Sequence, residues 1–310
     1  MPQVLPPQPA RGDAGDLGFE FTAMATVCSV RLAGLAERDA RSLAQQAIAE
    51  ARRIEHKYSR YRADSLLSRI NQSAGSGSSI EVDEETAHLL DFASQIHDLS
   101  GGLFDITSGS LRRVWDFKSG KVPTPEQLAA VLPCIGWQDV KWSKLRIALP
   151  RAGMEIDFGG FGKEYAADRV ATLLAQAGVT SGVVNFGGDL RVLGPQPDGQ
   201  AWSVGISHPR RAGALVASIQ LAQGALATSG DSERFFELDG RRYCHILNPR
   251  TGWPVARWQS VSVIAPVCLA AGALTTIAML MEDQAPEFLR EQGVGFLTVD
   301  RDGSIQQESV

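Results

Sequence analysis

The stretch at residues 157–168 joins an acidic side chain, a run of glycines and a lysine at a spacing that could bind phosphate. Asp157 comes first, three of the next five residues are glycines, and Lys163 follows them directly. Glycine has no Cβ, so backbone built from it can approach a ligand closely. Backbone N–H groups at the start of a helix, beside a lysine, suit an anionic phosphate. The same pattern is typical of a tight turn without a ligand, so this stretch alone leaves both interpretations open.

The elements expected to position this stretch are a strand before it and a helix after it. Residues 154–156 alternate in character and predict the end of a strand. Apolar residues then recur at spacings of three and four until Gly178, which predicts a helix ending there. A second strand, of the buried type, is predicted at 181–189 and closes with its own glycine pair. The glycine turn is therefore expected inside a strand–helix–strand unit.

The rest of the chain mixes short helical and strand-like segments. Helices are predicted at 38–58, 65–71, 81–96, 126–132 and 269–281. Strands are predicted at 19–30, 202–206, 215–221, 225–228, 234–237, 261–265 and 294–299, with short strands in 137–149. No repeat of fixed period is visible. Hairpins segregated from helices favour an α+β fold with mixed or antiparallel sheets and flanking helices over a doubly wound parallel sheet.

Composition excludes several classes of function. The 310 residues are 44% hydrophobic and 21% charged, which suits a large core or two closely joined lobes. The net charge is −5 and no basic run is interleaved with aromatic residues, so nucleic acid is not an expected partner. No apolar run reaches the length of a membrane span. Residues 1–17 are rich in proline and glycine and predict a disordered leader, with 18–310 forming a single domain.

The expected location is the cytoplasm. The N-terminus lacks the basic and apolar regions of a signal peptide. The four cysteines are scattered without a C-x-x-C pair, which indicates free thiols in a reducing compartment. His88 and His97 have no metal-ligand partner four residues on, so packing or surface roles are expected for them. Residues 100–109 predict either a helix-to-helix connection or a loop that presents Asp105 to a ligand.

Eight short motifs follow one another between Phe19 and Val299. They are Met24-Ala25-Thr26; Ser59-Arg60-Tyr61 with Ser65 and Asn71; Gly102 to Thr107 with Leu111 and Trp115; residues 157–168; Asn185 to Asp189; Ala227 to Gly230; His245 to Pro254; and residues 271–276. In this order they resemble the FAD:protein FMN transferases, also called the ApbE family. The resemblance covers nearly the whole chain and implies the ApbE-like fold of two closely joined lobes.

The resemblance implies a definite chemistry. Members of this family bind FAD, cleave its pyrophosphate with Mg²⁺ and join the FMN phosphate to a threonine hydroxyl of a partner flavoprotein, releasing AMP. A transferring phosphoryl group needs its charge neutralised by backbone N–H groups, a cation and a metal. A hard divalent cation takes oxygen ligands and keeps some waters. No acceptor motif is visible in this chain, so the expected acceptor is another protein.

Carried over by position, the resemblance assigns roles to individual residues. FAD binding would fall to Met24, Tyr61, Leu103, Phe104, Asp105, Asp157, Lys163 and Ile246. The metal would meet the backbone of Gly160, position 272 and the side chain of Thr276. Catalysis would involve Lys163, Thr276 and His245.

Structural interpretations of the same residues also stand. Tyr61 and Met24 could belong to the core. Asp157 could cap the following helix. His245 could order its own loop, and Asp105 could be a turn residue.

The largest departure from the family pattern lies in residues 271–276. The family shows Ala-Asp-Ala-Leu-x-Thr, whose aspartate and threonine share one helix face and ligate Mg²⁺. This chain has Gly272 in place of the aspartate and keeps Thr276. Glycine offers no ligand atom and lowers helix propensity by up to about 1 kcal/mol relative to alanine, so a purely structural reason for it is not obvious from the sequence. Loss of the anionic ligand is expected to weaken Mg²⁺ binding.

Three further departures are smaller. Glu164 stands where glycine is usual, and its carboxylate could either compensate at the metal or neutralise Lys163. Asn248 stands where aspartate is usual, and Ala25 replaces a glycine. Besides the working transferase, two alternatives are therefore carried: a catalytically impaired family member that binds FAD, and an FAD pyrophosphatase that gives FMN and AMP.

Overall fold

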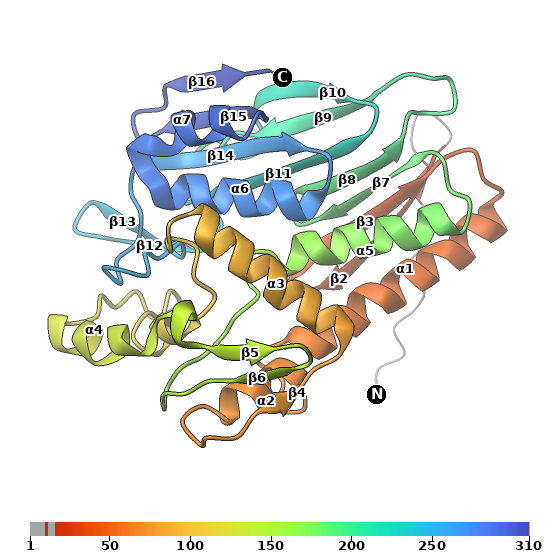
Figure 1. The fold of residues 1–310 in the computed structure, drawn as a ribbon. Helices are drawn as coiled ribbons and strands as arrows, with labels where there is room; N and C mark the ends of the chain where they lie inside the picture. Colours follow the sequence, from red (N-terminus) through yellow and green to blue (C-terminus); the bar gives the residue numbers. More distant parts are fainter. Residues whose placement is uncertain (1–9, 12–15, 310) are drawn as a thin grey trace. The chain divides into compact units, whose positions relative to one another are not determined.

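The computed structural model describes residues 10–11 and 16–309 (Figure 1). The chain divides into two units. The first unit contains the described residues up to His56, together with Phe161–Thr228 and Ser262–Gly272. The second contains Lys57–Gly160, Ser229–Val261 and the described residues from Ala273 onward. Each unit is thus assembled from stretches that are far apart in the sequence.

The first unit is built on an antiparallel sheet. Its elements are β1 (Ala10–Arg11), β2 (Leu17–Ala23), β3 (Thr26–Leu32), α1 (Glu37–Tyr58), α5 (Gly162–Gln176), β7 (Gly182–Phe186), β8 (Asp189–Gly194), β9 (Trp202–Ser207), β10 (Leu215–Leu221) and β11 (Gly224–Gly230). The strands pair in the order β1-β2-β3-β7-β8-β11, each antiparallel to its neighbour. β9 and β10 form a separate antiparallel hairpin.

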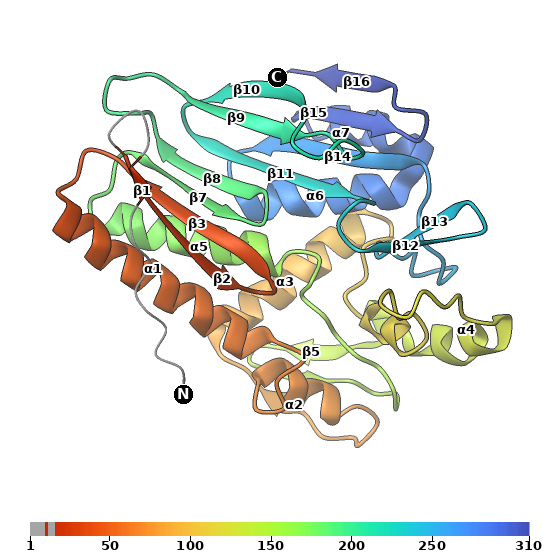
Figure 2. The same cartoon turned by 180° about the vertical axis from the view of Figure 1, so that it is seen from behind.

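Helices α1 and α5 cover one face of this sheet, as the front and back views show (Figure 2). The side of α1 that is buried carries Ala40, Ala44, Ala47 and Ala51 at near-regular helical spacing. Such small side chains let a helix approach its neighbours closely, while the opposite side of α1 keeps its charged residues in water. β14 (Trp258–Ala265) and α6 (Cys268–Met281) contribute residues to both units.

The second unit combines short helices with small sheets. Its further elements are α2 (Leu66–Gln72), β4 (Ile80–Glu81), α3 (Glu84–Leu99), η1 (Gly109–Arg113), α4 (Pro125–Val131), η2 (Leu132–Cys134), η3 (Trp137–Asp139), β5 (Lys141–Ser143), β6 (Arg146–Ala148), β12 (Phe235–Leu238), β13 (Arg241–Cys244), η4 (Glu282–Gln284), α7 (Ala285–Glu291), β15 (Gly295–Asp300) and β16 (Ile305–Glu308). The pairs β4–β6, β5–β6, β12–β13 and β15–β16 are antiparallel.

Local side chains fix the starts of three of these helices. Ser65 accepts a hydrogen bond from the Ser68 N–H at the start of α2. Asp83 does the same for α3, and Thr124 forms a capping box with Gln127 at α4. These caps satisfy backbone donors that have no partner inside the helix. The sequence offers Asp64 or Ser65 as the cap of α2, and Ser65 is the residue that caps it.

The α+β prediction with antiparallel sheets and flanking helices is confirmed, and two local predictions need correction. The strand predicted at 19–30 is a hairpin, because Met24 and Ala25 adopt φ of 54° and 59° and reverse the chain between β2 and β3. The strand end predicted at 154–156 is reduced to an isolated bridge between Glu155 and Ser108. Of the predicted leader, residues 1–9 and 12–15 lie outside the described residues, while β1 pairs with the start of β2.

Candidate active site

The glycine turn that precedes α5 is held by its own aspartate. Asp157 lies 2.7 Å from an Arg60 guanidinium nitrogen and accepts the Gly159 N–H at 3.1 Å. Asp157 is therefore not the cap of α5: the helix begins at Gly162, and Phe161 at the N-cap makes no side-chain cap bond. N–H groups in the first turn of a helix that lacks a side-chain cap remain available to an anionic group.

Gly160 has a packing reason to be glycine. A Cβ at this position would lie 2.7 Å from Cζ of Phe104, whose ring is buried. The aromatic ring and the backbone of the turn therefore touch, which no larger residue at position 160 would permit. The metal-facing role expected for the Gly160 backbone stays a prediction.

The Asp105 side chain stabilises its own loop by accepting hydrogen bonds. One carboxylate oxygen accepts hydrogen bonds from the N–H and hydroxyl of Thr107, at 2.7 and 2.5 Å, and the other accepts the Trp137 N–H at 3.0 Å. The carboxylate is buried, and its oxygens are engaged by protein donors. This geometry favours the turn interpretation of Asp105, and its contact with FAD stays a prediction.

An open cavity of about 560 Å³ lies beside this loop. It is lined by His97, Gly101, Gly102, Asp105, Leu132, Ile135, Gly136, Gln138, Pro249 and Arg250. His97 Nε2 lies 3.9 Å from an Asp105 oxygen, and Arg250 donates to the Gly101 carbonyl. The adjacent Leu103 is half-buried. His97 and Arg250 were not predicted as site residues; their position relative to the Gly102–Thr107 motif depends on folding, not on sequence spacing.

Tyr61 is an exposed aromatic platform, contrary to its interpretation as a core residue. Its relative exposure is 76%. The guanidinium carbons of Arg112 and Arg60 lie 4.9 and 5.4 Å from the ring centroid, and Arg112 donates to the phenol oxygen at 3.0 Å. Two cations hold the ring at the surface by cation–π attraction. Such a ring is suited to stacking against a planar ligand. Arg60 belongs to the Ser59-Arg60-Tyr61 motif but was given no role there, and Arg112 lies in none of the motifs.

The first unit contains a buried cluster of charged groups at the start of α5. The Lys163 ammonium donates to Asp189, whose other carboxylate oxygen accepts the Thr228 N–H at 3.0 Å. Glu164 Oε1 lies 3.6 Å from the same ammonium. Burial raises the pKa of the Glu164 carboxyl; Lys163 opposes this shift and Asp189 adds to it. Lys163, predicted to meet FAD phosphate, is thus oriented by the Asn185–Asp189 motif.

Gly272 faces this cluster. A Cβ at position 272 would overlap Cγ of Glu164 and would lie 2.8 Å from its Oε1. A side chain on Gly272 and the present Glu164 side chain cannot occupy this space together. A structural reason for Gly272, which is not obvious from the sequence, is therefore found in the structure: the glycine makes room for Glu164.

Several hydroxyl groups lie close together around Thr276, the second residue of the predicted metal-binding pair. In the second unit, Ser229 Oγ lies 2.9 Å from Thr275 Oγ1 and 3.2 Å from Thr276 Oγ1. Thr276 follows Gly272 by four residues on α6, so both lie on one helix face. Among the residues that the structure describes, no group of three or more His, Cys, Asp or Glu side chains could hold a metal.

The remaining predicted residues lie in two loops. Met24 lies in the β2–β3 turn of the first unit and donates its N–H to Glu55 at 2.6 Å. Ile246 and His245 follow β13 in the second unit, where Ile246 is buried and His245 is half-buried. The indole of Trp115 anchors this loop by donating to the Gly252 carbonyl at 2.7 Å. Their proposed contacts with flavin stay predictions.

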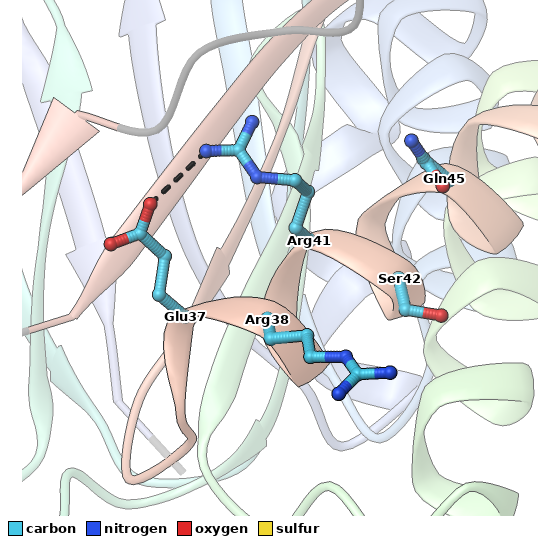
Figure 3. Close-up of a pocket in the computed structure, with 5 residues that line it drawn as sticks. All are labelled: Glu37, Arg38, Arg41, Ser42 and Gln45. Atoms are coloured by element: carbon cyan, nitrogen blue, oxygen red, sulfur yellow. Dashed lines mark hydrogen bonds and ion pairs between the residues drawn. The ribbon is translucent and has the colours of Figure 1, made fainter.

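A second hollow, of about 440 Å³, lies over the start of α1 and contains none of the predicted residues (Figure 3). It is lined by Glu37, Arg38, Arg41, Ser42 and Gln45. Glu37 and Arg41 form an exposed ion pair at 3.1 Å with the i,i+4 spacing of a helix surface. Such a face is ordinarily solvated, and we do not assign it to the site.

No helix within residues 10–11 and 16–309 is both long and apolar enough to cross a bilayer. The fold and site together define an α+β protein whose glycine turn, uncapped helix start and lysine–carboxylate cluster suit the handling of phosphate groups. The chain belongs to the ApbE family, which it matches over residues 24–298.

Relatives and solved structures support this membership. The FAD:protein FMN transferase of Haemophilus influenzae is 31% identical, over 80% of this chain and 75% of that protein. The Escherichia coli K12 protein of the same name is 30% identical, over 96% and 88%. The crystal structure of the ApbE protein from Thermotoga maritima is 30% identical, with a TM-score of 0.87 over 94% of this chain and 97% of that one. The flavin transferase ApbE from Vibrio cholerae has a TM-score of 0.83 and 27% identity, over 94% and 96%.

Proposed function

We propose that this protein is an FAD:protein FMN transferase. The observation that carries the proposal is the family match over residues 24–298, which includes every residue predicted for the site. Relatives of this name align with up to 96% of the chain. The exposed Tyr61 platform and the uncapped start of α5 supply the two kinds of surface that a flavin nucleotide needs, an aromatic face and phosphate donors.

The reaction is a phosphoryl transfer. The threonine hydroxyl oxygen of an acceptor flavoprotein forms a bond to the phosphorus of the FMN half of FAD. The pyrophosphate P–O bond to the AMP half breaks, AMP leaves with the bridging oxygen, and the hydroxyl proton is released. The transition state carries negative charge on the phosphoryl oxygens. Catalysis of this kind therefore depends mainly on hydrogen-bond donors and cations positioned to stabilise that charge.

In this assignment the chain's own residues orient the nucleotide and neutralise its charge. Lys163, held by Asp189, is the cation at the start of α5. The first-turn N–H groups of α5 add fixed positive potential. Tyr61 stacks on a planar ring of FAD. His245 contacts the flavin or a phosphate of FAD from the loop that Trp115 anchors. The site contributions of Met24, Leu103, Phe104, Asp105, Asp157 and Ile246 follow from the family pattern.

Magnesium dependence is part of the proposal, and the residues present fit such an ion. Glu164 Oε2 is buried and has no hydrogen-bond partner within the described part of the chain, and it is the kind of hard anionic oxygen that Mg²⁺ prefers. The family pattern, by resemblance, assigns contacts with the metal to the Gly160 backbone, to Thr276 and to position 272. A bound Mg²⁺ supplies positive charge to the pyrophosphate oxygens.

The experiment that tests the proposal incubates the protein with FAD, Mg²⁺ and a candidate acceptor flavoprotein. AMP release should accompany covalent flavin fluorescence of the acceptor in a denaturing gel, and an acceptor whose target threonine is changed to alanine should stay dark. FAD bound without AMP release would favour a catalytically impaired binder. Free FMN and AMP with an unlabelled acceptor would favour a pyrophosphatase.

A further inference from the structure

Glu164 is an unusual carboxylate in the first turn of α5. It retains 6% of its exposure, and its Oε2 has no hydrogen-bond partner among the described residues. Carboxylates are rarely buried unless they are paired or bound to a metal. The nearby ammonium of Lys163 is 3.6 Å from Oε1 and is shared with Asp189. One oxygen of Glu164 is therefore buried and unsatisfied.

The neighbouring carboxylate, Asp189, has a hydrogen-bond partner for each of its oxygens. Asp189 accepts from the Lys163 ammonium through one oxygen and from the Thr228 N–H through the other. Two buried carboxylates thus face one ammonium, and Lys163 donates its hydrogen bond to Asp189 while its nitrogen lies 3.6 Å from Glu164 Oε1. A further positive charge on the side of Glu164 would balance the pair. A hard divalent cation with oxygen ligands would supply it.

The space for this carboxylate comes from Gly272. A Cβ on this residue would fall inside the volume of the glutamate side chain, where it would overlap Cγ of Glu164. This space therefore admits one carboxylate. It can come from position 164 on α5 if position 272 on α6 is glycine, or from position 272 if position 164 is glycine. The family pattern has the second arrangement, and this chain has the first.

We infer that Glu164 supplies from α5 the carboxylate ligand of the divalent metal, and that Gly272 is the small residue that admits it. The use of the metal in FMN transfer rests on the proposed function, whereas metal binding itself does not need an acceptor. The inference also explains why two departures from the family pattern occur together.

The test measures Mn²⁺ binding to the full-length protein directly, from the electron paramagnetic resonance signal of free Mn²⁺, with and without FAD. Glu164→Gln keeps the shape of the side chain and removes its charge. It should weaken Mn²⁺ binding by about tenfold or more, in the range seen when the shell of a metal site is altered. Glu287→Gln, at an exposed position of α7, is the matched control and should bind Mn²⁺ as the unaltered protein does.

A double variant, Glu164→Gly with Gly272→Asp, moves the carboxylate to α6 and should restore Mn²⁺ binding to within about threefold of the unaltered protein. Gly272→Asp alone places two carboxylates in one space and should lower the melting temperature, which the double variant should recover. If Glu164→Gln folds poorly, Glu164→Gly decides when it is measured beside the double variant: it removes the carboxylate without replacing it and should lose the Mn²⁺ binding that the double variant keeps.

Equal Mn²⁺ affinity for the unaltered protein and Glu164→Gln would overturn the inference, and so would an unaltered protein that binds no Mn²⁺. Loss of binding in Glu164→Gln with recovery in the double variant supports it, even if no acceptor is ever labelled. Failure of FMN transfer with intact Glu164-dependent Mn²⁺ binding would instead count against the proposed function alone.

Discussion

The carboxylate of Asp168, on α5, accepts hydrogen bonds from the backbone N–H groups of Cys268 and Leu269 at 2.9 and 2.8 Å. These residues open α6, so Asp168 caps the helix that carries Gly272. Arg191 lies 3.6 Å from the same carboxylate. The last aspartate of the glycine-turn motif therefore fixes the start of α6 against α5.

Asp168→Ala is expected to destabilise the protein by about 1–2 kcal/mol, the usual cost of losing a helix N-cap. The two backbone donors at the start of α6 would lose the carboxylate that they share. Urea unfolding followed by circular dichroism measures the change. Asp302→Ala, in an exposed turn, is the control and should stay within about 0.5 kcal/mol. Equal stability of the two variants would contradict the capping role.

Trp115→Phe is expected to cost about 2 kcal/mol. The indole N–H donates to the Gly252 carbonyl at 2.7 Å in a buried setting, and phenylalanine leaves that carbonyl without this donor. The ring also packs in the core cluster with Leu111, Leu128 and Tyr243. Trp142→Phe, a half-buried site on β5, is the control, with a smaller expected loss. Similar denaturant midpoints for both variants would show that the bond to Gly252 contributes little.

Features set by neighbouring residues were predictable from the sequence. The cap at Ser65 and the long helix ending at Tyr58 depend on local hydrogen bonds and helical periodicity, and both are found. The order of the motifs was enough to indicate the family. The Met24–Ala25 turn was missed because turns with positive φ usually show glycine or asparagine, and neither stands there.

Features set by residues far apart in the sequence were not predictable. Gly272 looked like a lost ligand because its sequence neighbours say nothing about Glu164, which stands 108 positions earlier (272 − 164 = 108) and fills the space that a Cβ on Gly272 would take. The partner of Lys163 is Asp189, a residue of another motif. Side-chain pairs of this kind arise from packing, so the sequence indicated which residues matter and the structure shows which ones act on each other.

Tyr61→Ala is expected to weaken FAD binding by about tenfold or more while leaving stability nearly unchanged. The ring is 76% exposed, so its removal costs little folding free energy. A lost stacking contact with a planar base is ordinarily worth about 1–3 kcal/mol. Tyr61→Phe keeps the ring, loses only the Arg112 hydrogen bond and should retain most of the affinity. Titration of FAD fluorescence measures both, and undiminished affinity in Tyr61→Ala would remove Tyr61 from the site.

Cys134 is expected to be the one cysteine that reacts quickly with a thiol reagent in the native protein. Burial raises the pKa of Cys28 and of Cys244 to about 11, and it also raises the pKa of Cys268. A higher pKa means less thiolate at a given pH, and a thiol of pKa 11 is only about 0.1% ionised at pH 8. Cys134 is only partly buried.

Ellman's reagent at pH 8 should therefore label about one thiol per chain rapidly, and all four once urea unfolds the protein. Cys134→Ser should abolish the rapid phase, whereas Cys244→Ser should leave it intact. The three buried thiols, whose pKa values are raised, should stay slow at this pH. Rapid labelling of a second cysteine in the native state would show that one of the buried sites opens.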